Sequence, residues 1–485
     1  MSLFNLKRKN KNSQVKNRAG GNAYAISPEL SLAEMLVTSF AQDQFYRSAE
    51  QTFEDLQNVM NKVNPLFAAK AAIYARQEMG MRSITHVLAA ELAANASGKD
   101  WAKDFYEAIV KRPDDMLEIV SYVYANKGNK IPNAMKKGFA KAFDKFDAYQ
   151  LAKYRGTQRA VKLVDLVNLV HPIPTQKNAK ALADLVNNEL RSKNTWESKL
   201  SRAGQATTDK EVAAEKASAW VDLIRNGQLG YFALLRNLRN IAAQAPEIMD
   251  EALAQLTDVK RIEKSMVLPF RFLTAYKQFD GTDAIDRQIR AALDKAIGLS
   301  CDNVPALENS LIVIDNSGSM QSAVANSKHL QCSEAGAIFG MILAKKSNAD
   351  IMEFGTNARY IPYNLKDSVM EFGATFAQRN KVGHGTDFNA IFKKADKAYD
   401  RIVILSDMQG WIGGGAPNKT VAEYKNRFKV DPFIYSFDLR GYGSMQFPEK
   451  NVFALAGFSD KVFDIMQLLE TDRQALVTKI EAVEF

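Results

Sequence analysis

Residues 311–319 read LIVIDNSGS and residues 401–407 read RIVILSD, so two short apolar runs end in aspartates, Asp315 and Asp407. Similar apolar runs and helix-like stretches alternate in this part of the chain, with runs at 351–354 and 433–439 and helices at 333–346, 387–399 and 419–428. Strands that alternate with helices predict a largely parallel, doubly wound α/β sheet. Because ligands of such sheets bind at the carboxyl ends of the strands, we expect a site near Asp315 and Asp407.

The polar residues at these predicted strand ends carry only oxygen ligands. Asp315, Ser317 and Ser319 are spaced by two, so a tight turn could direct all three side chains to one point. Thr386 lies in a loop before a predicted helix, and Asp407 ends the second strand. Hard cations such as Mg²⁺ prefer such ligands, with water filling the remaining positions. The alternative is that Asp315 and Ser317 only cap a helix.

This set of motifs resembles the metal-ion-dependent adhesion site (MIDAS) of von Willebrand factor A domains. The resemblance implies that Ser317, Ser319 and Thr386 ligate a divalent metal, with Mg²⁺ the expected ion. It also implies that Asp315 and Asp407 act directly or through water. Such a site usually binds a carboxylate of a partner, although many intracellular relatives use it structurally or leave it empty.

Catalysis is not expected at this site. No nucleophile–base pair accompanies the motifs, and a single hard-metal site without a second carboxylate cluster is a poor two-metal site. His384 neighbours the Thr386 loop and could act as a general base, but we interpret it as a surface or loop-packing residue. We therefore expect a protein that is not an enzyme.

The chain before residue 300 has a different pattern, with no period-2 alternation from residue 31 to about residue 293. Its segments with helical spacing of apolar residues lie at 65–79, 83–96, 101–111, 113–125, 132–146, 160–170, 178–190, 212–225, 229–243, 247–255 and 284–297. Many consecutive helices with short polar connections imply an α-solenoid or a bundle. No clean repeat length distinguishes between the two.

The distribution of charge along the chain indicates which class of partner the protein binds. Residues 1–300 contain 44 Lys and Arg against 33 Asp and Glu, while residues 301–485 contain 20 against 22, within a total net charge of +9. A basic first part suggests a polyanion such as nucleic acid, and a merely solvated basic surface is the alternative. Residues 1–20 hold six Lys or Arg and no acid, which indicates a flexible tail, or else a nucleic-acid arm.

We expect a cytoplasmic protein. The N-terminus does not read as a signal peptide, and no run of about 18 apolar residues predicts a membrane span. The chain has two cysteines, which provide no disulfide framework and fit a reducing compartment. We expect no membrane partner.

A basic segment stands out within the helical part. Residues 127–162 contain ten Lys or Arg and two acids. If 132–146 is a helix, Lys137, Lys141 and Lys145 repeat every four residues along one face. Such like-charge spacing is mildly unfavourable without a counter-anion, which favours a polyanionic partner, with a solvated lysine face as the alternative.

The amino-acid sequence of this segment resembles the TROVE module of the Ro autoantigen family. The stretch IPNAMKKGFAKAFDKFDAYQLAKYR, the following VKLVDLVNLVHP and the preceding RPDDMLEIVSYVYANKGNKIPNA carry the resemblance, as does the early GNAYAISPELSLAEMLVTS. A TROVE module followed by a von Willebrand A domain is the Ro arrangement. After the basic tail at 1–20, the resemblance implies a helical-repeat RNA-binding domain at 21–300 and a von Willebrand A-like domain at 301–485.

The family implies a fold and partners. It implies an all-α, HEAT-like solenoid closed into a monomeric ring by the A domain. The basic outer surface would bind a small noncoding Y-type RNA, and the ring would accept single-stranded 3′ ends of misfolded RNA. An exoribonuclease is an expected partner of such a scaffold in RNA quality control.

Individual RNA-binding residues follow from the resemblance. The matched positions and their basic neighbours are Lys136, Lys137, Lys141, Lys153, Arg155, Arg159 and His171. The basic side chains would take phosphates, and a neutral histidine can stack on a base or contact its edge. For His171 the alternative is a packed residue at a helix end, and Arg159 follows a loop, Gly156 to Gln158, that departs from the family pattern.

Two other functions remain open from the sequence. One is a protein-binding adaptor that uses the MIDAS to hold an acidic partner residue, with the basic region only solvated. The other is a nuclease, which the single predicted metal site makes the least favoured of the three.

Overall fold

The computed structural model describes most of the chain. The described residues are 14–16, 22–24, 27–38, 49–156, 158–190, 196–265, 267, 270–300, 306–323, 330–407, 417–439, 452–455, 466, 470 and 474–485. The residues predicted to form a flexible tail, 1–20, lie outside this set except for Gln14–Lys16. Those three residues form strand β1, which pairs antiparallel with β2 (Asn22–Tyr24).

The first part of the chain is helical, as predicted. A first group of helices comprises α1 (Pro28–Thr38), α2 (Ala49–Met60), α3 (Pro65–Gln77), α4 (Ser83–Asn95), α5 (Ala102–Ala108), α6 (Pro113–Asn126), α7 (Asn133–Ala142), α8 (Ala148–Lys153), α9 (Leu163–Val170) and α10 (Ala179–Val186). A second group comprises α11 (Trp196–Ala203), α12 (Asp209–Arg225), α13 (Tyr231–Gln244), α14 (Met249–Leu256), α15 (Val259–Ser265), α16 (Phe270–Tyr276) and α17 (Ala284–Ser300).

Neighbouring helices pack against one another along the chain, for example α3 on α4, α4 on α6 and α12 on α13. The predicted helix at 132–146 ends earlier, because α7 stops at Ala142 and residues 143–145 form a 3-10 turn. The aromatic residues of this segment, Phe139, Phe143 and Phe146, are buried. Burial of each phenylalanine ring contributes about 1.5–3 kcal/mol.

The last part is an α/β domain with a six-stranded sheet. Its strands are β3 (Ser310–Asp315), β4 (Asp350–Phe354), β5 (Ala358–Ile361), β6 (Arg401–Ser406), β7 (Phe433–Asp438) and β8 (Val452–Leu455), in the order β5-β4-β3-β6-β7-β8. All neighbouring pairs are parallel except β4 with β5. The helices of this domain are α18 (Cys332–Ser347), α19 (Val369–Thr375), α20 (Phe388–Lys394), α21 (Pro417–Phe428) and α23 (Ala475–Glu481).

The alternation of side chains along β3 divides the core of this domain. Ile312 and Ile314 belong to the apolar cluster that contains α18, while Leu311 and Val313 belong to the cluster on the opposite face with α20 and α21. Every residue of β3 is buried, as expected for a central strand covered by helices on both faces. The four predicted strands are confirmed, whereas edge strands β5 and β8 were not predicted.

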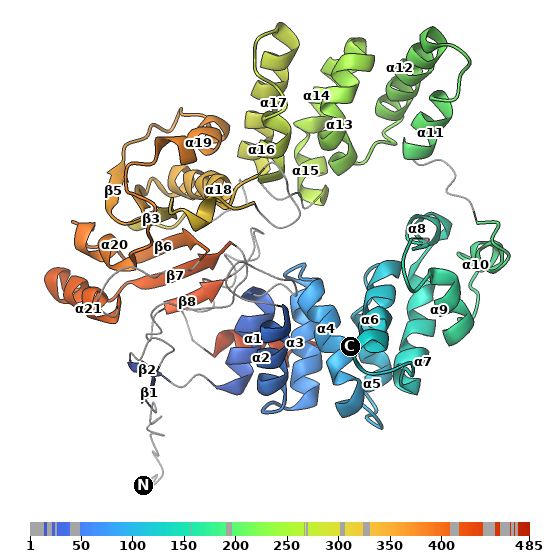
Figure 1. Cartoon of the computed structure of the whole chain (residues 1–485), viewed down its shortest axis with the longest axis horizontal. Coiled ribbons are helices and arrows are strands. Elements are labelled where there is room, and N and C mark those ends of the chain that lie inside the picture. The colour runs from blue at the N-terminus through green and yellow to red at the C-terminus, as the bar shows by residue number, and fades with distance from the viewer. Residues whose placement is uncertain are drawn as a thin grey trace, which may run out of the picture.

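The helices follow an arc, and the α/β domain joins both of its ends, so the chain forms a ring (Figure 1). At one end α16 packs on α18 and α19, and Arg290 pairs with Glu371 at 3.3 Å. At the other end α1 packs on β8 and on α23. The predicted architecture, a helical solenoid closed into a ring by a doubly wound domain, is confirmed. Among the described residues, we find no helix with the length and apolar character that a membrane span requires.

Candidate metal site and basic helical surface

Asp315 and Asp407 lie side by side at the carboxyl ends of two central strands of the sheet. Asp315 is the last residue of β3 and Asp407 follows β6, which is the parallel neighbour of β3. Both side chains are fully buried, as are Ser317 and Thr386. The structure therefore brings these predicted residues to the carboxyl ends of the two central strands.

Hydrogen bonds connect the residues of this cluster. Asp315 Oδ1 accepts from the backbone N–H of Ser317 at 2.8 Å, and Asp315 Oδ2 accepts from Ser406 Oγ at 2.5 Å. Ser319 Oγ donates to Asp407 Oδ1 at 3.3 Å and lies 3.3 Å from Ser317 Oγ. The spacing by two in the DNSGS turn thus directs its side chains to one point, as predicted.

The Thr386 loop is attached to this turn through the backbone. Gly318 N–H donates to the carbonyl of His384 at 2.8 Å, and a Cβ at Gly318 would lie only 3.4 Å from that oxygen. Thr386 Oγ1 is buried and has no hydrogen-bond partner among the described residues. Such a buried hydroxyl costs free energy unless a ligand or water satisfies it.

The electrostatics of the cluster favour a cation. Burial, and secondly the charge of Asp407, raise the pKa of Asp315 above its usual range. Two adjacent buried carboxylates and three hydroxyls are the ligand types that a hard divalent cation takes. A cation here would offset the cost of burying both charges. No group of three or more His, Cys, Asp or Glu suited to a metal occurs among the described residues, so the hydroxyls are essential to this assignment.

Neighbouring residues that the sequence did not single out hold the turn in place. Asn316 Nδ2 donates to Glu353 Oε1 at 3.1 Å, and the backbone carbonyl of Asn316 accepts from Asn380 Nδ2 at 2.6 Å. Ser406 also contacts Asp315 directly, although it was not among the predicted ligands. Its position before Asp407 at a strand end was the available signal.

Two alternatives for these residues are answered by the structure. The next α-helix, α18, begins at Cys332 with Gln331 at its N-cap, so Asp315 and Ser317 do not cap it. His384 is exposed, and its carbonyl bonds the Asp315 turn. His384 therefore fits the interpretation as a surface or loop-packing residue.

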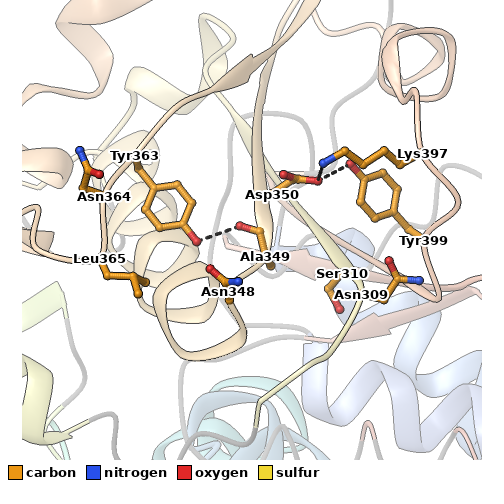
Figure 2. Close-up of a pocket in the computed structure, with 10 residues that line it drawn as sticks. All are labelled: Asn309, Ser310, Asn348, Ala349, Asp350, Tyr363, Asn364, Leu365, Lys397 and Tyr399. Carbon is orange, nitrogen blue, oxygen red and sulfur yellow. Dashed lines mark hydrogen bonds and ion pairs between the residues drawn. The ribbon is translucent and has the colours of Figure 1, made fainter.

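A separate polar cavity of about 500 Å³ opens at the other end of the strands, where β3 and β4 begin. Figure 2 shows Lys397 and Tyr399 converging on Asp350, at 2.7 and 2.8 Å. Tyr363 donates from its hydroxyl to the carbonyl of Ala349 at 2.9 Å. Asp350, Tyr363, Lys397 and Tyr399 thus each have a hydrogen-bond partner in this cavity, in contrast to Thr386 in the metal cluster.

The predicted basic face of α7 is shorter than expected. Lys136 and Lys137 have no hydrogen-bond or ion-pair partner among the described residues. Lys141 forms an ion pair with Asp144 at 2.6 Å. Lys145 lies beyond the end of the helix, where its amino group donates to the carbonyls of Glu107 and Val110. Only Lys136 and Lys137 thus present uncompensated charges on α7.

The basic residues at and after the end of α8 are partly engaged within the chain. Arg155 donates to the carbonyl of Leu190 at 2.5 Å, and Arg159 forms an ion pair with Glu118. The amino group of Lys153 lies 5.6 Å from the ring centres of Tyr149 and of Tyr154. Sequence reasoning did not predict the partners of Arg155 and Arg159, because Leu190 and Glu118 lie more than 30 residues away from them in the chain.

His171 closes α9 in a left-handed conformation, with φ 51°. Its side chain is exposed and precedes Pro172 and the 81% exposed Ile173. The packed helix-end alternative does not hold, because the imidazole faces solvent. The helix that carries it, α9, packs against α7.

Comparisons with known proteins agree with this arrangement of domains. A TROVE domain model matches residues 26–212 and 188–291, and a Ro60 vWA domain model matches residues 309–469. Together the two TROVE matches cover more than half of the chain. The chain therefore belongs to the TROVE domain family, with a vWA domain of Ro60 type.

The chain is also similar to individual proteins of known name or structure. It is 25% identical over 473 residues to the "RNA-binding protein RO60" of Deinococcus radiodurans, covering 86% of this chain and 88% of that protein. The crystal structure of the Deinococcus radiodurans RO (RSR) protein superposes with a TM-score of 0.62 at 18% identity, covering 93% of this chain and all of the other. "Telomerase protein component 1" of Mus musculus is 26% identical over 315 residues, and the matched region spans only 12% of that protein.

Proposed function

We propose that this chain is an RNA-binding scaffold that binds a small structured noncoding RNA of Y type on its α7–α9 surface. The ring would hold single-stranded 3′ ends of misfolded RNA, and the protein would present them to a partner such as an exoribonuclease without changing them chemically. Membership of the TROVE family and the name of the Deinococcus radiodurans relative support RNA as the ligand.

One observation carries this proposal at the residue level. Lys136 and Lys137 are adjacent on α7 and have no acidic partner among the described residues. Unpaired cations on a rigid helix suit phosphate contacts, since binding there releases counterions without breaking an internal ion pair. His171, exposed at the end of the packed helix α9, would supply the contact to a base.

The test compares two matched lysine pairs in the full chain. The affinity for a structured RNA of the Y class, measured by filter binding over a range of salt, should fall about tenfold in Lys136→Gln/Lys137→Gln. The slope of log affinity against log salt should drop by about 0.9 for each phosphate that the variant no longer binds. Lys393→Gln/Lys394→Gln, at the end of α20, is the control and should bind like the parent protein. An equal decrease in both pairs would show nonspecific charge attraction only.

We also propose that Asp315, Ser317, Ser319, Thr386 and Asp407 hold Mg²⁺. The unpartnered Thr386 hydroxyl supports this assignment, and so does the pair of buried carboxylates. When bound, the ion would supply a positive charge able to accept a carboxylate from a protein partner. A second function, that of a protein-binding adaptor, follows from this site. It predicts a Mg²⁺-dependent pull-down that ribonuclease does not affect and Asp315→Ala abolishes.

A further inference from the structure

The polar cavity at the amino ends of β3 and β4 lies apart from both sites proposed above. Its volume of about 500 Å³ is within the range of about 300–1,000 Å³ that ligand pockets occupy. Strand β3, six residues long, separates it by about 20 Å from the metal cluster at the carboxyl ends of the strands. The basic pair Lys136 and Lys137 belongs to the helical part of the chain. The cavity is therefore available to a different kind of ligand.

Three asparagine side chains line this cavity without a hydrogen-bond partner among the described residues. They are Asn309 before β3, Asn348 after α18 and Asn364 after β5. Figure 2 shows them along one row, with Asn364 beside Tyr363 at one side, Asn348 in the middle and Asn309 at the other side. Each amide group has two N–H donors and one oxygen acceptor. The cavity thus presents a line of groups that can both donate and accept.

Two of these asparagines hold a backbone conformation that side chains rarely adopt. Asn309 has φ 47° and Asn348 has φ 48°, both in the left-handed region. Asparagine adopts this conformation more readily than other residues because its amide can bond the local backbone. Neither amide forms such a bond to a described residue. The two amides are therefore not needed for the local fold and can bond a ligand.

The walls that carry the amides are fixed by other hydrogen bonds. The Tyr363 hydroxyl bonds carbonyls within α18 and just before β4, each at 2.9 Å. Asn364 and Asp367 close a turn through two bonds of 2.8 and 3.0 Å. On the other side, the backbone carbonyl of Asn309 accepts from the N–H of Asp400 at 3.0 Å. A ligand would therefore bind to a prearranged surface, which lowers the entropic cost of binding.

The lining of the cavity carries no net charge. Its one acid, Asp350, and its one base, Lys397, form an ion pair at 2.7 Å. Asp350 also accepts from the hydroxyl of Tyr399 at 2.8 Å. A polyanion such as RNA gains no electrostatic attraction from a neutral surface. The ligand that suits this cavity is uncharged and carries both hydrogen-bond donors and acceptors.

An extended peptide has this chemistry. Asn Nδ2 can donate to a main-chain carbonyl while Oδ1 accepts from a main-chain N–H, so one amide can pair with a peptide in both directions. Main-chain bonds of this kind give affinity in peptide recognition, and side chains that alternate along the peptide give specificity. Leu365, next to Asn364, is 59% exposed and adds an apolar surface on which one such side chain can pack.

We propose that this cavity binds an extended, uncharged segment of a partner protein. Asn309, Asn348 and Asn364 bond the main chain of the segment, and one of its apolar side chains covers Leu365. This docking site is independent of the proposed RNA binding. It also differs from the carboxylate-binding role proposed for the metal cluster, because it requires neither a metal nor a charge on the partner.

A neutral saccharide is the rival ligand, since asparagine amides and the Asp350 carboxylate also bind hydroxyl groups. A sugar ring in addition packs its C–H groups on an exposed aromatic face. Tyr399 is only 2% exposed and Tyr363 is half-buried, whereas the exposed apolar side chain of the lining is the aliphatic Leu365. The lining therefore favours a peptide over a saccharide.

The test begins with a library of random peptides of about eight residues, displayed on phage and selected on the full chain. Selection should enrich peptides of low net charge that contain an apolar residue. An enriched peptide is then synthesised with a fluorescein label, and its affinity is measured by anisotropy. Asn309→Gly/Asn348→Gly should weaken binding at least about tenfold, because the hydrogen bonds of two amides are lost. Leu365→Ser should weaken it at least about threefold.

Glycine is the informative replacement at these two positions. It adopts the left-handed conformation without strain, so the variant should fold like the parent protein while lacking both amides. Asn188→Gly is the matched control, since Asn188 is also exposed and left-handed, with φ 58°, but lies just after α10 and outside the cavity. It should bind the peptide like the parent.

Three further readouts separate this site from the others. The same peptide with N-methylated main-chain amides keeps its side chains but lacks N–H donors, and it should bind at least about tenfold more weakly. Affinity should change by less than about twofold between about 0.05 and 0.5 M salt, because no net charge attracts the ligand. Removal of divalent metal with EDTA should leave the affinity unchanged.

Several results would contradict the inference. They are the absence of any enriched peptide, or an enriched peptide that binds Asn309→Gly/Asn348→Gly as tightly as the parent. Displacement of the peptide by maltotriose at equal concentration would assign the cavity to a saccharide. Strong weakening by salt or by EDTA would place the peptide at another site. None of these results bears on the RNA-binding test with Lys136 and Lys137, so the two proposals fail separately.

Discussion

Asp115 is fully buried in the helical region and accepts hydrogen bonds from the side chains of Arg76, Arg82 and His86, at 2.8 to 3.2 Å. Burial alone would raise the pKa of Asp115, but the His86 hydrogen bond and the Arg76 charge outweigh it and hold the pKa well below its usual range. The aspartate thus connects α3, α4 and the start of α6 in one network.

Asp115→Asn should destabilise the protein by about 3–5 kcal/mol, because it leaves buried cations without their counter-ion. Urea unfolding followed by far-ultraviolet circular dichroism measures the change. Asp104→Asn, at a side chain 51% exposed, is the control and should alter stability by less than about 0.5 kcal/mol. A similar small effect at both positions would show that the network contributes little.

The lowered pKa of Asp115 predicts that the free energy of unfolding depends on pH. Because the pKa of Asp115 is lower in the folded than in the unfolded state, its stabilisation is present above the unfolded value of about 3.9 and is lost as the pH falls below it. The difference in unfolding free energy between the parent and Asp115→Asn should therefore shrink between pH 6 and pH 3. A difference that stays constant over this range would contradict the assigned pKa shift.

Thr386→Val separates metal binding from folding. Valine has nearly the same shape and removes a buried hydroxyl with no partner among the described residues, so metal-free stability should stay within about 1 kcal/mol of the parent or rise. Mg²⁺ affinity, measured by calorimetry, should fall at least tenfold if the hydroxyl is a ligand. Unchanged affinity would remove Thr386 from the ligand set.

At the scale of single elements, helix α7 requires a glycine where it packs against the backbone of α5. A Cβ at Gly138 would lie 2.5 Å from the carbonyl oxygen of Lys103 and 2.6 Å from Cβ of Tyr106, both on α5. Gly298, in α17, has no atom within 4 Å of its Cβ position. The two glycines therefore differ in the room available for a Cβ atom, although both lie within helices.

Gly138→Ala should destabilise the protein by about 1–3 kcal/mol through overpacking, and by more if α5 cannot shift. Gly298→Ala should stabilise it by about 0.5–1 kcal/mol, because alanine loses less backbone entropy in a helix. Thermal unfolding of both variants measures the contrast. A stabilising Gly138→Ala would mean that α5 and α7 are less closely packed than the structure has them.

What the sequence could predict also depends on the element. The strand ends at Asp315 and Asp407 were predictable, because apolar runs of strand length followed by polar turns determine which residues reach the sheet edge. The end of α7 was not predictable, because Lys145 bonds the carbonyls of Glu107 and Val110, at and just beyond the end of α5. The cavity lined by Tyr149 of α8 and Phe232 of α13 was not predictable either, because these two residues lie far apart in the sequence.

On the scale of the whole molecule, the C-terminal segment attaches the α/β domain to the first helices. Helix α23 packs on α1 and α3, and Lys70 donates to the carbonyl of Glu481 at 2.5 Å. The ring of Phe485 lies 6.5 Å from Trp101 and 6.2 Å from Phe105, centre to centre. These contacts connect the α/β domain to the first helices.

Removal of residues 475–485 should therefore loosen ring closure. Small-angle scattering should give a larger radius of gyration, and amide exchange should rise in α1 and α3, which would no longer have this packing partner. Glu484→Ala changes an exposed side chain of the same segment and should leave both quantities unchanged. An unaltered radius of gyration after the removal would show that α1 and β8 close the ring by themselves.

RNA binding by the ring-shaped molecule is the central claim, and sequencing the nucleic acid that copurifies with the protein from its own cells tests it most directly. The account predicts one abundant, structured small RNA that high salt releases and that is depleted when Lys136, Lys137 and His171 are replaced. The absence of any enriched RNA, or equal recovery with the replaced residues, would contradict it.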